Sequence, residues 1–270
     1  MIYVLHKKYA YIIKMTWIQA LEYKANTLVG AFAIFSGLII EYLIWNQIYS
    51  TQGLVEIRGF TFPGLMVYIF LSMMVGQLKS SWATSLEMID SIRSGELNKF
   101  LIRPISFYIY HLMMFIGYNS LFYIVYFIAL IFFPIIFPGW IFSTLLQIFG
   151  FIVALIISIY LSYSIYYCMV CIAFWFGEVR SLLIAYNVAN IILSGQIIPL
   201  RMFPQSVQEI IYLTPLKYLI DFPVSIATGS LPINTWAFNF LVAIFWCLTM
   251  TLLGKLIYNN GIQVYEGYGS

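Results

Sequence analysis

Long apolar stretches separated by short polar segments dominate the sequence. A helix needs about 20 apolar residues to cross a bilayer, and the pattern predicts six such spans. Their expected ranges are 26–49, 62–81, 108–133, 141–173, 181–199 and 236–258. The fourth range is longer than the membrane and is expected to tilt or to project into the cytoplasm. The pattern therefore predicts an all-α integral membrane protein with one transmembrane domain over 1–270.

The composition supports the same class of protein. The chain is 63% hydrophobic and only 9% charged, whereas a soluble domain carries about 25% charged residues. A net charge of +3 gives nucleic-acid binding no electrostatic support. Cys168 and Cys171 have the C-x-x-C spacing of half a zinc site or of a redox pair, but no second pair and no nearby histidine accompany them. We therefore expect buried thiols and no metal site.

The first 25 residues combine apolar and basic side chains on opposite faces of a predicted helix. At 100° per residue, one arc holds an apolar set, and lysines lie mostly opposite to it. The apolar arc consists of Leu5, Tyr9, Ile12, Ile13, Thr16 and Ala20. This arrangement is typical of an interfacial helix that lies in the headgroup layer, so residues 1–25 are predicted to form one.

Residues 200–234 are interrupted by prolines and cannot form one helix. Five of the nine prolines lie in or next to this range, at Pro199, Pro204, Pro215, Pro223 and Pro232. The segment is too apolar for a free loop. We expect broken or re-entrant helices packed on the outer face.

The segment 82–105, between the second and third spans, holds a quarter of all charged residues. A mixed-charge helix between two membrane spans is expected to lie in water. Leu86, Ile89 and Ile92 give it one apolar face, and Ser94-Gly95 ends the helix. A second short helix then groups Leu97, Phe100 and Leu101, and Arg103-Pro104 ends it.

A short amphipathic helix with charges of both signs is suited to docking a soluble protein. We therefore predict a cytoplasmic coupling helix in this segment, with a partner-binding set of seven residues. These are Glu87, Asp90, Arg93, Gly95, Glu96, Lys99 and Arg103. The alternative is a solvated loop that only sets the topology.

The distribution of basic residues predicts the orientation of the spans. Ten lysines and arginines fall on the side of the termini, the 82–105 segment and the connection around Arg180, and three fall on the other side. Cytoplasmic loops carry the excess of Lys and Arg. Both termini are therefore predicted inside, and residues 200–234 outside.

Four polar residues within the predicted spans are candidates for a substrate pathway. Glu41 is a charge inside the first span, where buried charges are expensive and often functional, although it could also lie near the outer interface. Asn187, Asn190 and Ser194 share one face of the fifth span. They could line a translocation path or form hydrogen bonds between helices.

The order of these features resembles the type-2 ABC transporter permeases, and the resemblance covers nearly the whole chain. Two stretches carry it: Ile92-Arg93-Ser94-Gly95-Glu96-Leu97 through Leu101-Ile102-Arg103-Pro104, and Ser194-Gly195 through Pro199, Phe203-Pro204 and Leu213-Thr214-Pro215-Leu216 with Tyr218. The family implies a pair of permease chains, each docked to a cytoplasmic ATPase that carries ATP and Mg²⁺. This sequence contains no P-loop of its own and no visible catalytic cluster.

The expected function is the permease subunit of an exporter in the bacterial plasma membrane, driven by ATP that a separate subunit hydrolyses. The substrate, and whether the second permease is the same chain, stay open. One alternative is an ion-coupled secondary transporter, for which Glu41 gives thin support. The other is a membrane enzyme acting on lipid, which would need a polar catalytic cluster at the interface.

Overall fold

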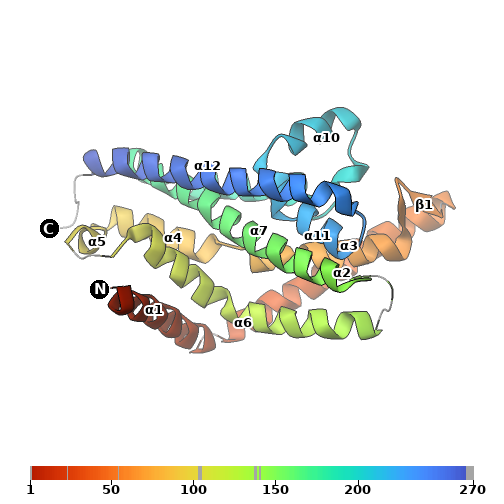
Figure 1. Cartoon of the computed structure of the whole chain (residues 1–270), viewed down its shortest axis with the longest axis horizontal. Helices are drawn as coiled ribbons and strands as arrows, with labels where there is room; N and C mark the ends of the chain where they lie inside the picture. The colour runs from red at the N-terminus through yellow and green to blue at the C-terminus, as the bar shows by residue number, and fades with distance from the viewer. Residues whose placement is uncertain are drawn as a thin grey trace.

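The computed structural model describes residues 2–22, 24–53, 55–102, 105–136, 139 and 141–265. Most of its long helices run along the longest axis of the molecule (Figure 1). In chain order, the long helices are α1 (Ile2–Glu22), α2 (Lys24–Gln52), α3 (Phe62–Leu78), α6 (Phe107–Ile136), α7 (Leu145–Cys171) and α12 (Trp236–Gln263).

Short elements connect these helices. They are β1 (Glu56–Ile57), β2 (Phe60–Thr61), α4 (Trp82–Arg93), α5 (Asn98–Ile102), α8 (Ala173–Phe176), α9 (Arg180–Leu193), η1 (Leu200–Met202), α10 (Gln205–Tyr212), η2 (Pro215–Leu219), α11 (Asp221–Ala227) and η3 (Ile233–Thr235). The strands β1 and β2 form a small antiparallel hairpin. Its turn residues Arg58 and Gly59 both have positive φ, of 51° and 86°, as tight two-residue hairpin turns require.

Five helical segments among the described residues are long and apolar enough to cross a membrane. They cover Phe32–Thr51, Phe62–Arg93, Phe107–Phe133, Leu145–Phe176 and Ile233–Gln263. The protein is therefore an all-α, multi-pass integral membrane protein. Both termini and α5 lie at one end of the long axis, and the β1–β2 hairpin lies at the other (Figure 1).

The range 181–199, predicted as the fifth span, differs from the prediction. Helix α9 has only 14 residues, which is about 21 Å at 1.5 Å per residue and shorter than the hydrocarbon core. The helix ends at Leu193, and Gly195 then adopts a φ of +86° that turns the chain. A continuous helix over 181–199 is therefore wrong, because the helix ends well before the expected boundary and the backbone turns there.

Helix α1 lies against α6 along the arc predicted to be apolar. Thr16 is buried in this contact, whereas Lys8 and Lys14 are exposed. The two backbones come so close that a Cβ atom added at Gly117 would overlap the Thr16 hydroxyl. The predicted arc of α1 is thus covered by protein, and the open side carries the lysines together with exposed apolar side chains such as Met15 and Ile18.

Helix α7 is the centre of the bundle, with α12, α11 and α4 packed around it. Its contact with α12 needs a small residue, since a Cβ atom added at Gly254 would lie 2.8 Å from Tyr167. Helix α7 also begins with a capping box, in which Thr144 and Gln147 each bond the backbone of the other. These features fix both the start of α7 and its main partner.

Residues 200–234 form several short helical elements, and a proline precedes or begins η1, α10, η2 and η3. Helix α11 is buried along its whole length. Its first residue, Asp221, accepts a hydrogen bond of 2.9 Å from the Tyr68 hydroxyl on α3. The Gly195 carbonyl lies 3.0 Å from the same hydroxyl. This polar contact joins α3, the turn after α9 and α11.

Candidate functional site

The charged segment forms a helix that packs on the bundle through its apolar face. Met88, Ile89 and Ile92 on α4 are buried, where the helix contacts α6, α7 and α8. Leu86 is only partly buried. The predicted apolar face therefore exists, and protein rather than lipid covers it. Half of α4 is thus held rigidly against the membrane helices.

The helix ends where Ser94-Gly95 predicts. Gly95 has a φ of +80°, a conformation that side chains other than glycine, asparagine and aspartate rarely adopt. The next turn packs back, since the Leu97 amide donates to the Ser91 carbonyl at 3.0 Å. Leu97 and Phe100 are buried as expected, but Leu101 points away from them and is exposed. Helix α5 begins only at Asn98, so Leu97 precedes it and the three side chains do not share one helical face.

Two ion pairs connect the end of α4 to the connection between α8 and α9. Arg180 lies 2.5 Å from Asp90, and Arg93 lies 2.5 Å from Glu178. Arg180 also lies 3.6 Å from Glu178, so the four groups form one network. All four side chains are about half exposed. The network therefore lies at the surface and links segments that are far apart in the sequence.

The remaining charges of the segment lie in different surroundings. Glu96 accepts a hydrogen bond of 2.6 Å from Lys99 on the surface, and this contact lowers the pKa of Glu96. Glu87 is partly buried and faces α6, where the Tyr118 hydroxyl donates to it at 3.2 Å. Glu87 was expected among the exposed charges, but its position on α4 turns it toward the bundle. Arg103 lies outside the described residues.

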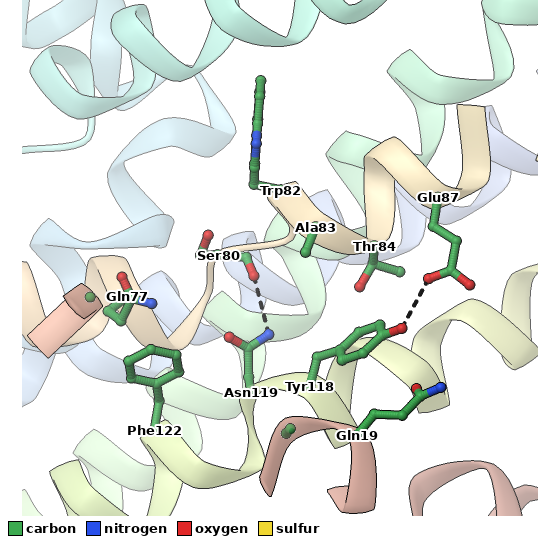
Figure 2. Close-up of a pocket in the computed structure, with 12 residues that line it drawn as sticks. Gln19, Gln77, Ser80, Trp82, Ala83, Thr84, Glu87, Tyr118, Asn119 and Phe122 are labelled. Carbon is green, nitrogen blue, oxygen red and sulfur yellow. Dashed lines mark hydrogen bonds between the residues drawn. The ribbon is translucent and has the colours of Figure 1, made fainter. Parts of the chain in front are cut away.

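A cavity of about 570 Å³ lies between α1, α6 and the break that separates α3 from α4. Figure 2 shows Glu87 and Tyr118 pointing toward one another in it, and Asn119 pointing to Ser80. The Asn119 amide donates to the Ser80 carbonyl at 3.2 Å, which satisfies a backbone group that the helix break leaves free. We call this space the α1–α6 cavity. Its polar lining makes it a place where a polar group can enter the bundle.

A second cavity, of about 340 Å³, lies between α2, α3, α7 and α9. We call it the α9 cavity. Asn187 and Asn190 line it, as does Lys79 at the end of α3. Asn187 accepts a hydrogen bond of 3.2 Å from the Tyr166 hydroxyl. Ser194 does not line it and is buried in the bundle. The two asparagines thus share this cavity, whereas Ser194, one turn after Asn190, is buried outside its lining.

The fourth pathway candidate, Glu41, lies apart from both cavities. It is on α2, and the Trp45 indole nitrogen one turn later donates to its carboxylate at 3.0 Å. Glu41 lines neither cavity. Its partner lies within the same helix, so the structure gives it no connection to the polar face of α9.

Lys79 was missed as a functional candidate, because in the sequence it counts only as one of the basic residues on the side of the termini. Its sequence signal is a lysine and two neighbouring polar residues, Gln77 and Ser80, at the end of an otherwise apolar span. The network between α4 and α9 and the contact between α3 and α11 were also missed, since no local pattern predicts pairs this far apart.

Comparison with known proteins identifies the family. Residues 35–269 match the family described as ABC-2 family transporter protein. No curated protein matches the chain. The match includes every apolar segment except the first three residues of the first one, together with the charged segment and the proline-rich segment. The chain therefore belongs to the ABC-2 transporter family and is a membrane permease of the ABC transporter class.

Proposed function

We propose that this chain is the membrane-spanning subunit of an exporter that a separate ABC ATPase drives. The observation that carries the proposal is the α4–α5 segment. Its buried face is fixed to three helices of the bundle, and its other face presents charges. A permease that does not bind the nucleotide itself must receive force through a rigid contact with the ATPase. The α4–α5 segment can form such a contact, because its buried face is fixed to the bundle.

The proposed docking surface comprises α5 and the exposed end of α4. Leu101 and Ile102 are 49% and 85% exposed there, next to the charged pair of Glu96 and Lys99. Apolar side chains with a charged rim are typical of a protein interface. We infer that the ATPase, which carries ATP and Mg²⁺, covers these side chains, and that Asp90, Arg93 and Gly95 shape the surface.

The proposed topology has both termini and the α4–α5 segment in the cytoplasm of a bacterial cell, with residues 200–234 outside. The ten-to-three distribution of basic residues supports it. The common position of the termini and α5 at one end of the molecule is consistent with it (Figure 1). Under this topology α9 and the turn after it are a shortened fifth crossing, and α12 is the sixth.

A second permease chain, the same or different, completes the proposed transporter. Helix α2 supports the presence of a second chain. It contacts the rest of this chain mainly through α3 and leaves most of its apolar side chains exposed, where another chain can cover them. We propose that the pathway runs along α9, past Asn187 and Asn190. Ser194 supports the turn beside it, and Glu41 has no contact with this route.

The test measures ATP-dependent accumulation in inverted membrane vesicles that contain the chain and its ATPase. Mass spectrometry of the vesicle contents, with and without Mg-ATP, detects a transported compound of any chemical class. We expect at least one compound to accumulate only with ATP and only when the chain is present. Accumulation that follows a proton or sodium gradient without ATP would contradict the proposal.

A further inference from the structure

Lys79 is a buried lysine whose amino group has no charged partner among the described residues. It follows the last residue of α3, and only 3% of its surface is exposed. Among the described residues, no carboxylate lies within 4 Å of its ammonium group. A buried charge that lacks a partner destabilises a fold, so such a residue needs another reason to be there.

The described residues that line the α9 cavity include a basic side chain and no acidic one. Among the described residues that line it, Lys79 is the only charged one, and four carry side-chain amides. The amides belong to Gln77, Asn187, Asn190 and Gln196. Lysine offers only hydrogen-bond donors, and each amide offers an NH₂ group. The cavity can therefore surround a negatively charged group with donors, and no carboxylate in its lining would repel that group.

Asn190 adds an independent sign that a ligand belongs in this cavity. It is 98% buried, since only 2% of its surface is exposed, and its side-chain oxygen has no hydrogen-bond partner. Buried polar atoms in native proteins nearly always have partners. The unpartnered atom is an acceptor, so a hydroxyl that the ligand carries beside its anionic group would satisfy it. Asn190 on α9 and Lys79 after α3 line the same cavity.

We propose that the α9 cavity binds an anionic group, a phosphate or a carboxylate, on the molecule that the permease transports. Lys79 supplies the charge, and the amide NH₂ groups of Asn187, Asn190 and Gln196 donate to the anionic oxygens. The Asn190 oxygen accepts from a hydroxyl of the same molecule. This inference rests on the proposed transport function and adds the chemical class of the substrate to it.

The α1–α6 cavity offers a route to this site. The two cavities share Gly30, Gln77 and Ser80 in their linings, so they lie on two sides of the break between α3 and α4. Figure 2 shows Gln77 and Ser80 at that break. A molecule at the membrane surface can therefore present its polar end to Lys79. Such an end can belong to a lipid headgroup or to a soluble phosphate ester.

The test measures binding to the purified full-length chain by native mass spectrometry. The probes are dioleoyl phosphatidylglycerol, dioleoyl phosphatidylcholine with the same acyl chains, and sn-glycerol 3-phosphate without any acyl chain. We expect the anionic lipid, the soluble phosphate or both to bind at least tenfold more tightly than phosphatidylcholine. Binding of the lipid alone identifies a headgroup site, and binding of the soluble probe shows that the phosphate suffices.

The matched variants are Lys79→Gln and Lys255→Gln, which remove a buried lysine and an exposed lysine. We expect Lys79→Gln to lose at least tenfold in affinity for the anionic probe, and Lys255→Gln to retain it. Equal effects of both substitutions, or no preference for anionic probes in the wild type, would overturn the proposal.

A folding defect is separated from a binding defect by thermal unfolding of the same samples. Lys79→Gln should unfold at the same or a higher temperature, because it removes an unpaired buried charge. Asn190→Asp places a carboxylate in the cavity and should also weaken anion binding. Both variants should still co-purify with the ATPase. A wild-type chain that co-purifies with the ATPase but shows no preference for anionic probes refutes this site alone, whereas absence of any ATPase refutes the proposed function.

Discussion

The Arg180 guanidinium lies 2.5 Å from the Asp90 carboxylate and joins the end of α4 to the start of α9. The second pair, Arg93 with Glu178, makes the same connection one turn away. Helix α9 carries Asn190 into its cavity. We infer that a movement of the docked α4–α5 segment moves α9 as well, because this network connects them. Coupling between two distant sites is carried by such chains of contacting residues.

Exchange of the charges in the Asp90–Arg180 pair tests this connection. Asp90→Arg or Arg180→Asp alone should lower ATP hydrolysis by the purified complex several-fold, because each places like charges together in the network. The double variant should recover most of the activity. The free energy of unfolding should change by less than about 1 kcal/mol in each variant, since exposed ion pairs contribute little to stability.

Glu209→Lys is the matched control for the charge exchange, because Glu209 is equally a surface carboxylate but lies on α10, away from the network. It should leave ATP hydrolysis unchanged. Single variants with wild-type hydrolysis, or a double variant no better than either single one, would show that the pair does not transmit motion.

The turn at Gly95 gives a second prediction. Its φ of +80° disfavours a side chain with a Cβ atom, and asparagine tolerates that region better than leucine. Gly95→Leu should cost about 1–2 kcal/mol in local stability and displace α5, whereas Gly95→Asn should cost less. The measurement is the amount of ATPase retained on the tagged chain. Equal retention by both variants would mean that the orientation of α5 is not required for docking.

Much of the charged segment could be predicted from the sequence, because its signals are local. The three-residue spacing of Ile89 and Ile92 predicted a buried face, and Ser94-Gly95 predicted the end of the helix. The expected burial of Leu101 is wrong, because the helix begins after Leu97 and the three side chains therefore do not share one helical face.

The rest could not be predicted because it depends on residues that meet only after folding. Arg180 pairs with a residue 90 positions away, and the Tyr68 hydroxyl reaches Asp221 across 153 positions. The early end of α9 depends on the turn at Gly195, which the long apolar run around it concealed. The cavity that joins Lys79 to Asn190 requires helices whose packing no single stretch encodes.

The unpartnered Asn190 gives a prediction about stability. Asn190→Leu removes a buried amide whose oxygen has no partner, so the unfolding temperature should stay the same or rise. Asn239→Leu is the matched control, since Asn239 is also buried but accepts from Lys217 at 2.8 Å and donates to the Thr235 carbonyl at 2.8 Å. Loss of the Asn239 amide should lower the free energy of unfolding by about 1.5–3 kcal/mol. A larger loss from Asn190→Leu would show that Asn190 is a structural residue.

The contact between Tyr68 and Asp221 gives a prediction about the proline-rich segment. Tyr68→Phe removes the hydroxyl that lies 2.9 Å from Asp221 and 3.0 Å from the Gly195 carbonyl. Buried acceptors without a donor cost about 1–3 kcal/mol, so the free energy of unfolding should fall by that amount. Tyr42→Phe, at an exposed tyrosine on α2, should have no effect. Equal stability of the two variants would show that the contact does not hold α11 in place.

The central claim, that this permease works through an ABC ATPase bound at α4–α5, is tested most directly by isolating the tagged full-length chain from its native membranes. Quantitative mass spectrometry would measure the ratio of a co-purified protein with a P-loop and an ABC signature to the chain. We predict a ratio near one in the wild type with measurable ATP hydrolysis, and at least a fivefold lower ratio for Gly95→Leu at equal membrane levels. A homogeneous wild-type preparation without such a protein, or an equal ratio in the variant, would contradict the account.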